Sequence, residues 1–95
     1  MAETTSEEHA TLEIKNRLGL HARAAVMLVQ TANRFDADVT VEKDGQVVNG
    51  RSIMGVMMLA AEQGSQIDVR ASGPQAREAV DAIRALVEAR FNEED

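Results

Sequence analysis

The stretch DVTVEKDGQVVN, residues 38–49, predicts the central feature of the fold. Apolar and polar side chains alternate over residues 38–42, the period-two pattern of a half-buried β-strand. Asp44-Gly45 follows, a dipeptide that favours a two-residue hairpin turn because both of its positions take positive φ. The chain returns through residues 46–49. We therefore expect an antiparallel β-hairpin here.

The sequence before the hairpin predicts one strand and one helix. Residues 11–15 alternate with period two, which places Leu12 and Ile14 on one face of a strand. From Ala22 to about Arg34 the apolar side chains recur at i, i+3, i+4 and i+7, the spacing of an amphipathic helix.

The sequence after the hairpin predicts a helix, a strand and a final helix. Ser52 is a good N-cap for a short helix over residues 53–60. Residues 67–71 alternate as a fourth strand, and Pro74 suits the first turn of a last helix. The order β-α-β-β-α-β-α predicts a two-layer α+β domain, with helices on one face of a mainly antiparallel sheet.

Length and composition predict one domain without disulfides. We expect it to cover residues 9–92 of the 95, between a disordered acidic tail, residues 1–8, and a short acidic tail, residues 93–95. There is no cysteine, hence no thiolate metal site. The beginning of the chain lacks the apolar segment of a signal peptide, and no apolar run is long enough to span a membrane. A cytoplasmic protein is expected.

The net charge of −6 arises at the two ends of the chain. Residues 9–92 hold ten acidic and ten basic side chains, so the folded body lacks the basic field that nonspecific nucleic-acid binding requires. Four basic residues lie near the two motifs described below, and they form either a local positive site or scattered solvated charges. They are Lys15, Arg17, Arg23 and Arg51.

The motif GLHAR, residues 19–23, places an imidazole and a guanidinium at the start of the first helix. Backbone N–H groups at a helix start lack intrahelical partners and lie at the positive end of the helix dipole, which suits an anion. His21 and Arg23 therefore suggest a phosphoryl acceptor and its anion-binding partner. Ordinary capping is the alternative interpretation of the pair.

Together with SIMGVM, residues 52–57, the GLHAR motif closely resembles the HPr family, the histidine-containing phosphocarriers of the bacterial phosphotransferase system. The resemblance covers about residues 10–91. It implies an open-faced β-sandwich, in which three helices cover one face of a four-stranded antiparallel sheet, in agreement with the element order above.

The resemblance implies a carrier that uses no cofactor and is not itself an enzyme. His21 matches the histidine that takes a phosphoryl group from enzyme I, charged by phosphoenolpyruvate, and passes it to enzyme IIA components. Arg23 matches the active-site arginine, whose planar donors fit phosphoryl oxygens. The family usually has proline where this chain has Ala24, which puts the rigidity of the His21 loop in question.

The second motif implies regulation and docking. Ser52 matches the serine that HPr kinase/phosphorylase modifies in many bacteria, although it could serve only as an N-cap. Leu20, Ile53, Met54 and Met57 are expected to form an exposed partner-docking surface, with burial in the core as the alternative. Val56 and Leu59 are expected to point inward.

Two other classes of function are weighed against the carrier. A purely regulatory binding protein on the same fold is the second hypothesis, and the presence of His21 favours the carrier over it. An enzyme with its own pocket fits poorly, since no acid–base partner, glycine-rich phosphate loop or metal-ligand set is evident near His21. His9 lies outside any motif and is given no role. We expect a monomer, and the sequence leaves open the sugar-uptake and the nitrogen-related branches.

Overall fold

The computed structural model describes residues 6–93, which form a four-stranded antiparallel sheet covered by helices. The strands are β1 (Ser6–Glu13), β2 (Asp38–Lys43), β3 (Gln46–Asn49) and β4 (Gln66–Gly73). Their order across the sheet is β1-β4-β2-β3, and every pairing is antiparallel.

The predicted hairpin is confirmed. Lys43 pairs with Gln46, so β2 and β3 are joined by Asp44 and Gly45 alone. These two residues have φ of 52° and 85°, the positive values that the turn requires.

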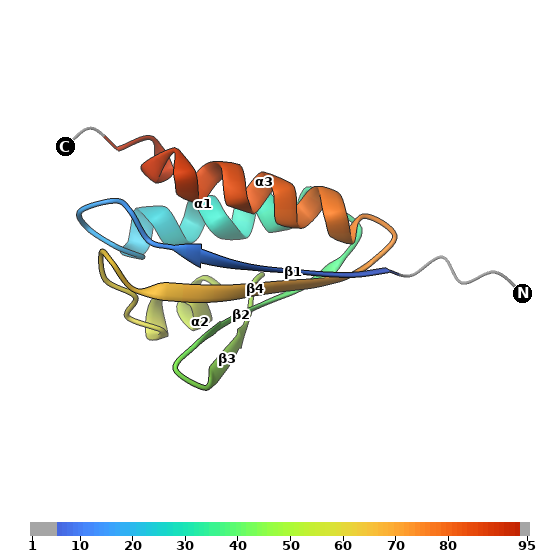
Figure 1. Cartoon of the computed structure of the whole chain (residues 1–95), viewed down its shortest axis with the longest axis horizontal. Helices are drawn as coiled ribbons and strands as arrows, with labels where there is room; N and C mark the ends of the chain where they lie inside the picture. Colours follow the sequence, from blue (N-terminus) through green and yellow to red (C-terminus); the bar gives the residue numbers. More distant parts are fainter. Residues whose placement is uncertain (1–5, 94–95) are drawn as a thin grey trace, which may run out of the picture.

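Three helices cover one face of the sheet, as the predicted open-faced sandwich requires. They are α1 (Ala22–Ala32), α2 (Ile53–Met58) and α3 (Ala76–Glu88). α3 packs against β1 and β4, while α1 contacts both α2 and α3. Figure 1 shows that the loop after β1, the start of α1 and the end of α3 lie at the same end of the molecule. Among residues 6–93, no helix is both long enough and apolar enough to cross a membrane.

The expected N-terminal tail is too long by three residues. Residues 6–8 belong to β1, where Ser6 pairs with Gly73 and Glu8 with Ala71. Pairing is through backbone N–H and C=O groups, so the polar side chains do not prevent it. The strand also places His9 in the sheet, and residues 1–5 lie outside the described part of the chain.

The end of the chain turns sharply after α3. Arg90, Phe91 and Asn92 form a short turn, η1 (Arg90–Asn92), in which φ is 57°, 52° and 59°. Left-handed backbone costs an L-residue roughly 1–2 kcal/mol, whereas burying a phenylalanine side chain stabilises the fold by roughly 1.5–3 kcal/mol. The fully buried Phe91 therefore offsets part of the cost of the turn that leads to Glu93.

Candidate functional site

His21 is the N-cap of α1, as the sequence predicts. Its extended backbone (φ −73°, ψ −179°) allows its carbonyl oxygen to accept the N–H of Ala25 at 2.8 Å. Its side chain makes no capping hydrogen bond. The imidazole is therefore available for other chemistry.

The loop that carries His21 depends on Gly19. This residue has φ of +69°, and a Cβ placed on it would lie 2.3 Å from the carbonyl oxygen of Ala61. The same oxygen accepts the N–H of Leu20 at 2.9 Å. The close approach, which only glycine permits, fixes the His21 loop to the segment that follows α2.

A carboxylate contacts the imidazole. Nε2 of His21 pairs with Oε2 of Glu93, 72 residues further along the chain. Nδ2 of the fully buried Asn16 donates to both carboxylate oxygens of Glu93 at 3.2 Å and to the Gly19 carbonyl at 2.8 Å. The loop before α1, which holds Asn16, Gly19 and His21, therefore meets the end of the described chain at the Glu93 carboxylate.

The Glu93 carboxylate is held in its charged form. Burial raises the pKa of Glu93, but hydrogen bonds from His21 and Asn16 and the positive charges of His21 and Arg23 lower it by more. The pKa consequently lies below its ordinary value, and Glu93 is ionised at neutral pH.

Arg23 lies in the first turn of α1 and is exposed. Within residues 6–93 its guanidinium makes no hydrogen bond or ion pair. A surface hollow at His21 is lined by Arg17, Leu18, Leu20, His21 and residues 60–63. The site thus offers a nucleophilic ring, an uncommitted guanidinium and the N–H groups of a helix start, an arrangement suited to a small anion.

Arg51, one of the four basic residues near the two motifs, has a structural role. Arg51 donates through Nη2 to the carbonyl oxygens of Phe35 at 3.1 Å and Ala37 at 2.6 Å, so it holds the loop before β2. Backbone carbonyls without partners are strong acceptors, which is why this guanidinium is used structurally.

Ser52 caps α2, as predicted. Its hydroxyl oxygen accepts the N–H of Gly55 at 3.0 Å. The side chain is half-buried at the helix start.

The α2 surface, formed by Ile53, Met54, Met57 and Met58, is exposed, with exposed fractions between 38% and 69%. Val56 and Leu59 are buried, as the sequence analysis expects. A docking role for the α2 surface remains a prediction.

The expectation that Leu20 belongs to an exposed docking surface is wrong. Leu20 is 4% exposed and packs in the core, whereas Leu18 is 61% exposed. The left-handed backbone of Gly19 lies between the two leucines, and the N–H of Leu20 is bound to Ala61. The turn therefore sends Leu20 inward and leaves Leu18 outside.

Sequence reasoning missed Glu93 and Asn16. Glu93 was expected in an acidic tail, but its side chain is 9% exposed and contacts His21. The signal that could have located it is Phe91, because a large apolar side chain so near the end of the chain is expected to anchor that end in the core. Residues 94–95 lie outside the described part of the chain.

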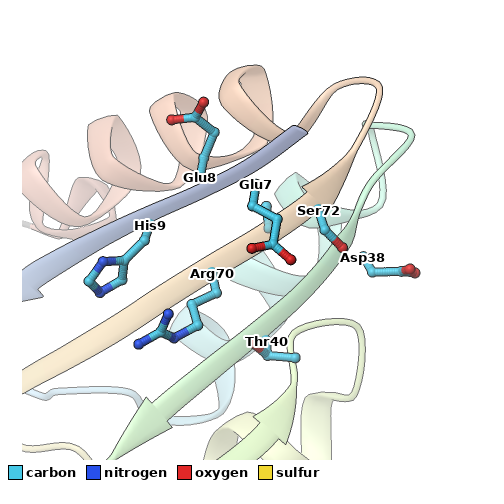
Figure 2. A pocket seen from close by; sticks show the side chains of 8 residues that line it. Glu7, Glu8, His9, Asp38, Thr40, Arg70 and Ser72 are labelled. Atoms are coloured by element: carbon cyan, nitrogen blue, oxygen red, sulfur yellow. The ribbon is translucent and has the colours of Figure 1, made fainter. Parts of the chain in front are cut away.

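A second hollow lies on the face of the sheet opposite the helices. Figure 2 shows His9, Arg70 and Thr40 along this face, while Glu8 points to the other side, toward α3. Nε2 of His9 lies 3.5 Å from Oδ1 of Asp68. This hollow has no helix start and thus no uncommitted backbone N–H groups of that kind.

The sequence and the fold match a known family. The family model described as "PTS HPr component phosphorylation site" matches residues 8–89. The phosphocarrier protein HPr of Xylella fastidiosa (strain Temecula1) is 49% identical over 83 residues, which cover 87% of this chain and 93% of that protein. The crystal structure of HPr-C-His from Thermoanaerobacter tengcongensis superposes with a TM-score of 0.89 at 45% identity, over 93% of this chain and 99% of that one. The crystal structure of an HPr dimer from the same organism superposes with a TM-score of 0.74 at 44% identity, over 98% of this chain and 100% of that one. The chain therefore belongs to the HPr family of the phosphotransferase system, and it is a phosphoryl carrier rather than an enzyme.

Proposed function

We propose that His21 is the residue of this carrier that accepts a phosphoryl group from phosphorylated enzyme I and passes it to enzyme IIA components in the cytoplasm. The observation that carries the proposal is the placement of an imidazole that makes no cap at the start of α1, two residues before an exposed arginine. A neutral imidazole is a nucleophile near physiological pH, since its unperturbed pKa is about 6.5.

Arg23 is proposed to bind the moving phosphoryl group. Its guanidinium can donate two parallel hydrogen bonds to phosphoryl oxygens, and phosphoryl transfer depends mainly on positioning and charge stabilisation. The remaining catalytic groups must come from the partner protein.

The proposed docking surface combines the α2 surface with Leu18. Leu18 lines the hollow beside His21, and residues 60–63, which follow α2, line the same hollow. Exposed methionine side chains adapt to several partners, which suits a carrier that must meet a donor and several acceptors. We propose that the chain meets these partners as a monomer.

The experiment that tests the proposal mixes the protein with enzyme I and phosphoenolpyruvate and then adds each available enzyme IIA. We expect an acid-labile phosphohistidine at residue 21, seen by phosphorus NMR, followed by loss of the label to at least one enzyme IIA. Failure of the protein to become labelled by active enzyme I would contradict the proposed function.

Ser52 is proposed as a negative switch, modified by an HPr kinase/phosphorylase. Its hydroxyl lies at the start of the helix that carries the α2 surface. Phosphorylation would add about −1.5 to −2 charges beside side chains that must be desolvated on docking. The start of a helix tolerates negative charge, so the fold should persist while binding weakens.

The Ser52→Asp variant tests the switch because aspartate remains a competent N-cap. It should keep the melting temperature of the parent and lower the affinity for enzyme I. The matched control is Ala85→Glu, which makes the same charge change at an exposed position of α3, a helix that packs against β1, β4 and α1. Equal phosphorylation kinetics in both variants and the parent would leave Ser52 as a cap only.

A further inference from the structure

We propose that Glu93 is a positioning residue for His21: its carboxylate orients the imidazole by holding the hydrogen of Nε2, and it balances the charge of the phosphorylated ring. The inference rests on the proposed role of His21 as the phosphoryl acceptor.

The first support is the contact itself. Nε2 of His21 pairs with Oε2 of Glu93, and an ionised carboxylate can only accept hydrogen bonds. Nε2 must therefore carry the hydrogen. A neutral imidazole has one N–H, so its lone pair lies on Nδ1.

The second support is that the carboxylate is held by fixed groups. Nδ2 of Asn16 donates to both of its oxygens, and Asn16 is fully buried between the end of β1 and Gly19. Because the Asn16 amide also donates to the Gly19 carbonyl, it couples the position of Glu93 to the loop that carries His21.

The third support is the backbone that delivers Glu93. Three consecutive left-handed residues turn the chain back toward the start of α1, and the fully buried Phe91 anchors this turn. A solvated acidic tail needs neither feature. The fold therefore places Glu93 against His21.

The transfer step balances without a proton donor or acceptor. The Nδ1 lone pair of His21 attacks the phosphorus of the phosphorylated donor, the new N–P bond forms, and the donor keeps the electron pair of the broken bond. The ring becomes a cation that still carries its Nε2 hydrogen, against the negative charge of Glu93. Onward transfer returns the electron pair to Nδ1, again without movement of the Nε2 proton.

Other charged groups of residues 6–93 lie near the ring but make no hydrogen bond or ion pair with it. Arg23 lies in the first turn of α1, while Arg17 and Glu62 line the hollow beside His21. Glu93 is the carboxylate that contacts the ring among residues 6–93. The matched control for its charge is Glu88, which is exposed on the last turn of α3.

Nitrogen-15 NMR of the ring tests the proposal directly. In the parent at neutral pH, His21 should show a protonated Nε2 and an unprotonated Nδ1. A parent spectrum dominated by the Nδ1–H form would overturn the proposal without any variant. In Glu93→Gln, the preference for Nε2–H should weaken, and the pKa of the phosphorylated ring should fall because the compensating charge is lost. Glu88→Gln should resemble the parent in both measurements.

Transfer kinetics give the second readout. At metal sites, losing the carboxylate that orients a ligating histidine typically costs about 10- to 100-fold in affinity or activity. By analogy, Glu93→Gln should slow phosphorylation of His21 by about tenfold. Parent-like tautomer, ring pKa and rate in a folded Glu93→Gln would overturn the role of Glu93 and leave the carrier function of His21 standing. Absence of label on His21 in the parent would overturn both.

Discussion

The two histidines of the chain have neighbours of the same chemical kinds but lie in different secondary-structure elements. Each contacts a carboxylate that also accepts a hydrogen bond from a neutral side chain and is influenced by an arginine. The first group is His21, Glu93, Asn16 and Arg23, and the second is His9, Asp68, Thr11 and Arg70.

The pKa values of the two carboxylates are also shifted in the same direction. The hydrogen bond from Thr11 is the largest influence on Asp68, and together with His9 and Arg70 it lowers the pKa of Asp68 against the opposing effect of burial. The pKa of Glu93 is lowered too. A shifted carboxylate beside a histidine therefore does not identify the functional site.

The difference lies in the backbone and in solvent exposure. His21 begins a helix, and its partner carboxylate is 9% exposed, whereas His9 lies in a strand and the side chains of His9 and Asp68 are 46% and 35% exposed. A helix start supplies backbone N–H groups for an anion, and a strand in a sheet does not. The comparison teaches that the backbone around a histidine, more than the charged side chains near it, suits it to phosphoryl chemistry.

The largest expected difference between the two groups is in covalent labelling. With enzyme I and phosphoenolpyruvate, the parent and His9→Ala should incorporate an acid-labile phosphoryl group at rates within twofold of each other. His21→Ala should incorporate none, because the nucleophile is lost. Phosphorus NMR and intact-mass measurement detect the phosphoryl group. Label retained in His21→Ala, or found on His9, would contradict the assignment of His21 as the acceptor.

The next difference concerns the two arginines. Losing a charge-assisted hydrogen bond costs about 1.5–3 kcal/mol, so Arg23→Ala should slow transfer roughly ten- to a hundredfold. Arg70→Ala, on the open face of the sheet, should change the rate less than twofold. Rapid-quench kinetics measure both rates. Similar rates for the two variants would mean that Arg23 is only a solvated residue of the first turn.

The neutral donors should differ in their contribution to stability. Asn16→Ala removes a fully buried amide that donates to the Gly19 carbonyl and to the Glu93 carboxylate, and the loss should cost roughly 1.5–3 kcal/mol of unfolding free energy. Thr11→Val removes one bond, 2.6 Å long and exposed, and should cost less than about 1 kcal/mol. Urea denaturation measures both, and equal losses would show that burial does not separate the two groups.

The smallest difference is in the pH dependence of stability. Because the pKa of Glu93 is lower in the folded chain than its ordinary value of 4.5, the ionised side chain stabilises the fold above that pH, and this contribution disappears as the pH falls below it. Glu93→Gln should therefore cost about 1 kcal/mol at pH 7 and little at pH values below the folded pKa.

Asp68→Asn is the control for that measurement. The stability that Asp68→Asn loses should also be present at pH 7 and should disappear as the pH falls below the ordinary pKa of 3.8. This loss of stability should be smaller than that of Glu93→Gln, since solvent screens an exposed pair. Unfolding curves collected at several pH values compare the two variants. If the unfolding free energy that Glu93→Gln loses is the same at every pH, the loss does not arise from the charge of the carboxylate.

Much of the fold followed from local pattern. Residues 38–49 predicted the central hairpin because alternation and an Asp-Gly turn are properties of neighbouring residues. The inward positions of Val56 and Leu59 followed from the helical period of α2. The prediction was wrong at the start of the domain, where residues 6–8 pair with β4. This pairing uses backbone groups, so the polarity of the side chains does not reveal it.

The site divides in the same way. The sequence alone determined that His21 begins a helix with Arg23 in its first turn and that Ser52 caps another, because these relations span three or four residues. Only the tertiary structure decided that Glu93, 72 residues away, lies against the ring, and that Leu18 rather than Leu20 is exposed. Periodicity and capping act within one turn of a helix or along one strand. The contact with Glu93 depends on the path of the whole chain and on where Phe91 finds a place in the core.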